Sequence, residues 1–265
     1  MRFAFSNIAW SPNDAPGVLA LLRAKRIQGI EVAPSKVWPE WQGATPAAAA
    51  LYRASLLEEG FEVPALQAVL FGRPEARLFD PQGERHLISH LTRVAAIAGA
   101  LGAGVVVFGA PRQRDRGDLE MESALESASR VFRELGKTYA DHGSCLCIEP
   151  NPKRYGCSFV VNSVEGEALV RRVNHPGFGL HLDAAAMFLE GEDLAARWPA
   201  LADIVRHYHI SEPDLADFRQ PAVPHQMNLA VLRRNGFTGW CSVEMREPSV
   251  PLDRSGPWAI LEGAR

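Results

Sequence analysis

The stretch FGLHLD at residues 178–183 is a short apolar run that ends in a carboxylate, and three neighbouring stretches have a related form. These are SCLCIEP at 144–150, IVRHYHIS at 204–211 and GWCSVEM at 239–245. The ionisable residues that close the four runs are separated by 34, 26 and 35 positions, and they are Glu149, Asp183, His209 and Glu244. Each spacing is about the length of one strand-helix unit. A ligand-type side chain at the end of four successive strands predicts a (β/α)8 TIM barrel, because the mouth of that barrel is built from the carboxyl ends of its strands.

Strand-like and helix-like segments alternate along the whole chain. Apolar runs typical of strands lie at 3–9, 28–33, 62–70, 104–109, 144–149, 178–183, 204–210 and 240–245. Helical periodicity occupies 15–26, 46–59, 84–101, 118–141, 163–172, 190–198 and 224–235, followed by a short tail near 251–263. Eight units of this α/β alternation predict a parallel sheet covered by helices, and favour closure into a barrel over an open doubly wound sheet. We expect one domain over residues 1–265, because this length is close to the ~250 residues usual for the barrel.

The composition argues against several classes of partner. The net charge is −3 and the basic residues are scattered, so there is no basic stripe of the kind that binds nucleic acid. No apolar run approaches the ~20 residues needed to cross a bilayer, and the start MRFAFSNIAW lacks the pattern of a secretion signal. We therefore expect a cytoplasmic protein without nucleic-acid or membrane partners. The cysteines form no CxxC pair and are expected to be reduced thiols of the core; they are Cys145, Cys147, Cys157 and Cys241.

The four strand-end residues are predicted to face the barrel axis. Side chains alternate along a strand with period two, so Glu149 shares a face with Cys147, whereas Ile148 points toward the helices. Three carboxylates that converge in a barrel mouth would repel one another and lose solvation, and a cation is the simplest compensation. A single residue of this kind is more often a helix cap or a surface ion pair. Four in consecutive strands favour a metal site, and its oxygen-rich ligands suit Mn²⁺, Mg²⁺ or Co²⁺, with Zn²⁺ as an alternative.

Three further ionisable residues are predicted to lie inside the barrel. His181 and His207 are one inward position deeper than the metal ligands, and either orient them by hydrogen bonding or are ordinary core histidines. Glu31 ends the second strand and faces inward, where it either binds a substrate hydroxyl or forms a structural ion pair. The sequence leaves both choices open.

At these residues the chain resembles the xylose isomerase-like TIM barrel superfamily, and within it the sugar phosphate isomerase/epimerase branch of ketose 3-epimerases and hydroxypyruvate isomerase. The resemblance covers essentially the whole chain. The motifs that carry it are GIEV at 29–32, CIEPNP at 147–152, GLHLD at 179–183, HYHISEPD at 207–214 and GWCSVEM at 239–245. Together these motifs are specific to the superfamily and not to a substrate.

The resemblance implies a chemistry as well as a fold. It implies a divalent metal held by Glu149, Asp183, His209 and Glu244, with Glu149 and Glu244 also acting as the acid-base pair. A metal chelated by a carbonyl and a neighbouring hydroxyl oxygen acidifies the adjacent carbon by stabilising an enediolate. One glutamate removes the proton and the other returns it. Return to the same carbon gives an epimer, and return to the neighbouring carbon gives an aldose-ketose isomer.

Three positions depart from the ketose 3-epimerase pattern. Ala186 stands where a substrate-contacting His would follow the Asp, Tyr155 where a second Glu would follow the first, and Leu215 where an Arg would follow the metal-binding His. The metal ligands are retained while the substrate contacts are not, so we infer a changed substrate. Arg219 lies close enough along the chain to replace the missing Arg.

Residues in loops at the predicted mouth are candidates for substrate binding. Arg112 and Arg114 follow the fourth strand, and Lys153 and Arg154 follow the fifth. Their cations suit a phosphate or carboxylate, although a solvated charged loop has the same appearance. Trp10 follows the first strand, where an aromatic side chain commonly forms an apolar wall for a sugar.

The sequence therefore predicts a metal-dependent isomerase or epimerase whose partner is a small carbohydrate: a sugar, sugar phosphate or sugar-like polyol. A lyase or deglycosidase that uses the same proton abstraction is the nearest alternative, and a non-catalytic sugar-binding or partner-binding barrel is the next. A nuclease of the endonuclease IV type is disfavoured by Ala186 and by the lack of a basic groove. Trp258 and Ile260 in the C-terminal tail either cap the barrel floor or contact a second subunit of a homo-oligomer.

Overall fold

The computed structural model describes all residues from 1 to 265, and its strands form one eight-stranded parallel sheet in the order β2-β1-β8-β7-β6-β5-β4-β3. The strands are β1 (Arg2–Ser6), β2 (Gly29–Glu31), β3 (Ala65–Leu66), β4 (Val105–Phe108), β5 (Cys145–Ile148), β6 (Phe178–Asp183), β7 (Val205–Ser211) and β8 (Trp240–Glu244). Between β2 and β3 only two isolated bridges remain, Gly29 with Glu62 and Val32 with Leu66. These bridges nearly close the sheet, so the barrel expected from the sequence is confirmed and the open sheet is excluded.

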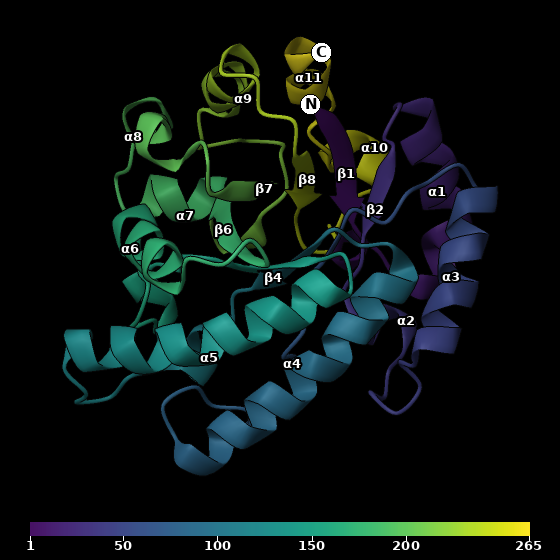
Figure 1. The fold of residues 1–265 in the computed structure, drawn as a ribbon. Helices are drawn as coiled ribbons and strands as arrows, with labels where there is room; N and C mark the ends of the chain where they lie inside the picture. The colour runs from purple at the N-terminus through teal and green to yellow at the C-terminus, as the bar shows by residue number, and fades with distance from the viewer.

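Helices surround the strands (Figure 1). They are α1 (Ala15–Ala24), α2 (Pro34–Val37), α3 (Pro46–Glu58), α4 (Pro81–Leu101), α5 (Met121–Asp141), α6 (Ser163–Val173), α7 (Ala184–Leu189), α8 (Leu194–Leu201), α9 (His225–Arg234), α10 (Leu252–Ser255) and α11 (Trp258–Ala264). Five short 3₁₀ helices complete the chain: η1 (Asn7–Ala9), η2 (Pro12–Asp14), η3 (Pro111–Arg114), η4 (Lys153–Tyr155) and η5 (Pro213–Leu215). None of the helices is long and apolar enough to span a bilayer.

Local sequence signals explain where the longer helices begin and end. Thr45 precedes α3, and its hydroxyl accepts a hydrogen bond from the Ala48 amide at 3.2 Å. Asp80 caps α4 in the same way through the Gly83 amide at 2.5 Å. Both helices have proline at the first position, where its missing N–H costs nothing. Gly102 ends α4 with φ of 74°, a conformation that favours glycine.

Two segments differ from the sequence expectation. The strand expected at 62–70 is reduced to Ala65–Leu66, because Pro64 cannot donate a ladder hydrogen bond and the chain turns away at Ala68, where φ is 52°. The helix expected at 190–198 is replaced by α7 and α8, and Gly191 in a left-handed conformation separates them. Helix α7 starts directly after Asp183, so this carboxylate is both a strand end and a helix cap.

The core lies mainly between the strands and the surrounding helices, in one apolar cluster that runs from Phe3 to Ala264. Trp258 belongs to it and rests against Phe5 of β1 with ring centroids 5.7 Å apart, so the C-terminal tail covers the barrel wall and not its floor. Inside the barrel, a smaller cluster of Ala65, Val105, Val107, Cys145 and Cys147 fills the space near β3, β4 and β5. All four cysteines are unpaired and buried, as expected.

Candidate metal centre

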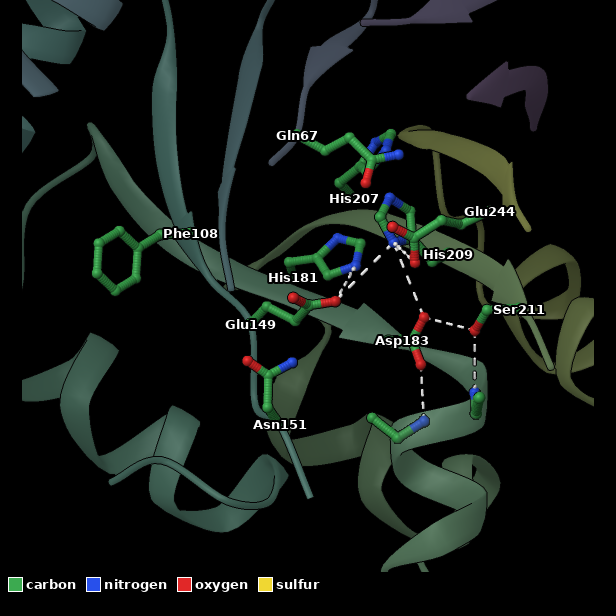
Figure 2. A network of polar contacts seen from close by, with 12 residues as sticks. Gln67, Phe108, Glu149, Asn151, His181, Asp183, His207, His209, Ser211 and Glu244 are labelled. Carbon is green, nitrogen blue, oxygen red and sulfur yellow. Dashed lines mark hydrogen bonds and ion pairs between the residues drawn. The ribbon is translucent and has the colours of Figure 1, made fainter. Parts of the chain in front are cut away.

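The four predicted ligands meet at the carboxyl ends of β5 to β8, around the imidazole of His209 (Figure 2). Its Nδ1 lies 3.2 Å from Glu244 Oε2, 3.8 Å from Asp183 Oδ2 and 3.9 Å from Glu149 Oε1. The strand register accounts for part of this arrangement, since Asp183 of β6 is directly beside His209 of β7. The structure thus brings together one imidazole and three carboxylates.

Glu31 fixes the orientation of the His209 ring by contacting its Nε2 atom. Both Glu31 oxygens lie 3.0 Å from His209 Nε2, and Oε2 is also 3.3 Å from His207 Nε2. A carboxylate only accepts, so Nε2 of His209 carries a proton and Nδ1 is turned toward the other ligands. Burial lowers the pKa of His209, but the charges of Glu31 and Glu244 raise this pKa well above its ordinary value. Glu31 is fully buried and pairs with both histidines, which agrees with the structural ion pair, one of the two roles that the sequence left open.

The Asp183 carboxylate accepts hydrogen bonds from helix α7 and from strand β7. Its Oδ1 accepts from the Ala186 amide at 2.7 Å as the N-cap of α7, and its Oδ2 accepts from the Ser211 hydroxyl at 2.5 Å. Ser211 in turn accepts from the Ala185 amide at 3.1 Å. Burial, and then the nearby charge of Glu244, raise the pKa of Asp183 to about 6. The carboxylate is therefore rigidly positioned, and the His209 charge and its two hydrogen bonds offset only part of the rise in its pKa.

The two carboxylate oxygens of Glu149 lie in different environments. Oε1 faces His209 at 3.9 Å and His181 Nε2 at 3.6 Å. Oε2 lies against Gly109, where an added Cβ would come within 2.3 Å of it, so any other residue at position 109 would force this carboxylate to move. Burial, followed by the charges of Glu244 and Asp183, raises the pKa of Glu149 to about 8. The residue is thus a carboxyl group that holds a proton near neutral pH when no cation is bound.

Arg114 contacts Asn151, whose side chain bonds to Glu149, and it lines neither hollow. Its side chain is fully buried and donates to Asn151 Oδ1 at 2.8 Å and to backbone carbonyl oxygens of Phe108 and Val160. A hydrogen bond from the Asn151 amide partly offsets the raised pKa of Glu149. The expectation that Arg114 reads a substrate anion is wrong, because the short helix η3 turns this guanidinium inward.

The donor set fits a divalent cation. Glu149, His181, Asp183 and His209 each offer an atom within 4.8 Å of the others, and Glu244 adds a third carboxylate beside His209. Both ring nitrogens of His181 are buried without a hydrogen-bond partner. Burial first, and then repulsion between the carboxylates, raises the pKa values of Glu149 and Asp183. A cation would neutralise these charges and give one of the two His181 nitrogens a partner.

Two hollows of about 300 Å³ each meet at the candidate centre, and both are lined by Glu149 and Glu244. The first hollow lies on the side of β3 and β4; the apolar residues Val69, Leu70, Phe71 and Phe108 line it together with Gln67 and Gln113. The walls of the second hollow include the polar residues Asn151, Glu212, Asp214 and Arg246. Two ligand-sized spaces thus share the two glutamates.

The three departures from the ketose epimerase pattern occupy one place in the structure. Tyr155, Ala186 and Leu215 all line the second hollow. The Tyr155 hydroxyl accepts a hydrogen bond from the Asp214 amide at 2.9 Å, and the Leu215 carbonyl accepts one from the Arg246 amide at 3.0 Å. The replacements therefore act together on one wall of the site and leave the ligand cluster intact.

The structure does not bring the other predicted substrate contacts into these hollows. Arg112 and Lys153 are exposed and line neither hollow. Arg219 pairs with Asp217 at 2.7 Å, and Trp10 lines a separate hollow. The proposed substrate site therefore omits these four residues and Glu31.

Sequence reasoning missed four polar residues that line the second hollow: Asn151, Glu212, Asp214 and Arg246. Asn151 and Arg246 each lie two positions after a candidate ligand, Glu149 or Glu244, and Glu212 and Asp214 follow β7. Their place directly after strand ends that carry candidate ligands is the signal that could have found them.

Comparisons with known proteins agree with this architecture. The structure is similar to the 3-keto-D-glucoside 4-epimerase of E. coli, with a TM-score of 0.81, 16% sequence identity, and coverage of 100% of this chain and 99% of that one. It is similar to the D-psicose 3-epimerase of Clostridium cellulolyticum H10, with a TM-score of 0.77, 16% identity, and coverage of 100% and 90%. It is also similar to the IolI protein with a bound zinc atom, with a TM-score of 0.74, 19% identity, and coverage of 100% and 95%.

At these identities the structural likeness concerns the fold. Among curated proteins, none matches this sequence significantly. The xylose isomerase-like TIM barrel family model matches residues 19–262, which is nearly the whole chain. The family expected from the motifs is confirmed: the chain belongs to the xylose isomerase-like TIM barrel family.

Proposed function

We propose that this protein is a divalent-metal-dependent isomerase or epimerase of an unphosphorylated sugar or sugar-like polyol. The observation that carries the proposal is the position of Glu149 and Glu244, which both face the junction of the two hollows and both lie beside His209. The sugar epimerases among the structurally similar proteins support the same reaction class.

The two glutamates suit proton transfer at carbon. A bound cation supplies charge stabilisation to the oxygens next to the reacting carbon, which acidifies its proton. Glu149 has one oxygen toward the ligand cluster and the other beside Gly109 in the first hollow, so it can ligate with Oε1 and exchange a proton through Oε2. Glu244 borders the same space and returns the proton. Return to the same carbon inverts it, and return to the neighbouring carbon moves the carbonyl.

The charges around the hollows support a neutral substrate. Arg246 is the only arginine or lysine that lines either hollow, and the same wall carries Glu212 and Asp214. A phosphate is normally held by several cations or by a bidentate guanidinium with few carboxylates near it. We therefore retain the sugar or polyol of the sequence prediction and leave out the phosphate. The altered wall at Tyr155 and Leu215 supports a substrate that differs from free ketoses.

Hydrogen exchange in deuterated water tests the proposal. The metal-loaded protein is incubated with ketoses, keto-glycosides, ketose phosphates and inososes, and carbon-bound deuterium is followed by NMR. We expect exchange at the carbon beside a carbonyl of an unphosphorylated compound, with an epimer or isomer as product. Exchange with release of a leaving group would identify a lyase instead. If the protein binds a compound and a cation but catalyses no exchange, the binding-barrel alternative replaces the enzyme.

A further inference from the structure

His181 is the one histidine of the barrel interior that has no polar partner. It lies on β6, two residues before Asp183, and its side chain is fully buried. His207 and His209 each place Nε2 on Glu31, but both nitrogens of His181 lack a hydrogen bond. A buried polar group without a partner loses its hydration without compensation, so such a group calls for an explanation.

Strand register places His181 beside the candidate ligand Glu149, although across β7 it pairs with His207 and not with His209. Ile148 of β5 pairs with Leu180 of β6, so the next residues, Glu149 and His181, are neighbours across the barrel wall. His181 Nε2 lies 3.6 Å from Glu149 Oε1, and Figure 2 shows the two side chains facing each other. A separation of 3.6 Å is too long for a hydrogen bond. The two atoms therefore face each other without an interaction that satisfies either.

The same separation is normal for two donors that share a metal ion. Donor atoms at about 2.0–2.2 Å from one cation lie about 3 to 4 Å from each other. The contacts of His209 Nδ1 with Asp183 and Glu149, at 3.8 and 3.9 Å, fall in the same range. The available donors of His181, Glu149, Asp183 and His209 lie within 4.8 Å of one another.

We propose that His181 Nε2 is a ligand of the same cation as Glu149, Asp183, His209 and Glu244. The centre then contains two imidazoles where the sequence alone indicated one. Because imidazole suits Zn²⁺ and Co²⁺, whereas Mg²⁺ takes oxygen ligands, the second ring shifts the preference of the site toward Zn²⁺ or Co²⁺. The inference rests on the cation of the proposed function and not on the reaction.

X-ray absorption of the zinc-loaded protein counts the imidazoles directly. We expect the outer-shell scattering of two histidine rings in the wild-type protein. One ring would overturn the inference, whatever the behaviour of any variant.

The substitution His181→Phe removes both nitrogens and keeps a ring of similar size. In this variant we expect one histidine ring around zinc, a changed visible spectrum of bound Co²⁺, and a loss of Co²⁺ affinity of at least about tenfold. The Mg²⁺ affinity is expected to change less. An unchanged spectrum and unchanged affinity for both ions would show that His181 does not bind the cation and only fills space in the core.

The matched control is His90→Phe. His90 is also a buried histidine, but it lies on α4 and its Nε2 is bonded to the Val69 carbonyl oxygen at 2.8 Å. We expect the wild-type spectrum and affinity, with circular dichroism confirming that both variants fold. If zinc has two histidine rings but the protein catalyses no deuterium exchange, the inference about His181 stands and the proposed function fails. If the protein catalyses exchange but zinc has one histidine ring, the proposed function stands and the inference about His181 fails.

Discussion

The two halves of the barrel are built differently, and the half formed by β5 to β8 carries all of the candidate ligands. Its strands have four to seven residues and pair in continuous ladders, apart from one irregularity between β6 and β7. In the other half, β2 has three residues and β3 has two, and isolated bridges join them. The regular half holds charged side chains in fixed positions, while the irregular half supplies the apolar wall of the first hollow.

Glu149→Gln should produce the largest effect, because it removes a ligand and a proton acceptor from the regular half. We expect the exchange rate to fall by at least about 10³-fold, within the range for a general base, together with weaker cation binding. NMR of deuterium incorporation and calorimetry with Co²⁺ measure the two losses. Glu58→Gln makes the same chemical change on the exposed face of α3 and should have no effect. Wild-type exchange in the Glu149 variant would remove this residue from the mechanism.

Glu31→Gln tests the single contribution of the irregular half to the ligand cluster. The amide loses the negative charge and replaces one of the two accepting oxygens by an NH2 donor, so the His209 ring, whose Nε2 lies 3.0 Å from both oxygens, is held less firmly in its direction. We expect cation affinity to fall about 10–100-fold, as for other partners of metal-bound histidines. Calorimetry gives the affinity, and steady-state kinetics should show a lower kcat with little change in KM. A change in KM alone would instead support direct binding of a substrate hydroxyl.

The stability of the metal-free protein should depend on pH because the ionisable groups of β5 to β8 are buried close together. The pKa of Glu149 rises from 4.5 to about 8 on folding, so the folded state binds more protons than the unfolded state between these values. Stability of the metal-free protein should therefore fall as pH rises from about 5 to about 8. The raised pKa values of Asp183 and His209 act in the same direction, and the lowered pKa values of His181 and His90 act in the opposite one.

A cation must displace the same proton. Its affinity should increase by at least about tenfold per pH unit below about 8 and less steeply above it, because Asp183 and His209, whose pKa values are also raised, must lose protons as well. Urea unfolding and Co²⁺ titrations across this range give the two slopes. Glu149→Gln should flatten both, and a pH-independent affinity in the wild-type protein would contradict the assignment.

Phe71→Ala should have the smallest effect, because it alters only the wall of the irregular half. The ring is 70% exposed and lines the first hollow, where it can cover an apolar part of the substrate. Loss of this partial burial should raise KM about three- to tenfold and leave kcat unchanged. Phe188→Ala removes another exposed ring, 44% accessible and outside both hollows, and is the control. Equal effects of the two changes would exclude the first hollow from substrate binding.

The sequence alone determined the barrel and the inward direction of its ligands. The spacing of Glu149, Asp183, His209 and Glu244 and the alternation within each strand are local properties, and the chain keeps them whatever surrounds it. The family followed from the same motifs, and the family match confirms it.

Tertiary structure decided which side chains stand at the same level and which loop residues face the site. The stagger between neighbouring strands placed His181 beside Glu149, although Asp183 is the residue that ends β6. Loop packing buried Arg114 and left Arg246 at the second hollow. Register and loop direction depend on contacts between residues far apart in the chain, so the periodicity of a single segment does not contain them.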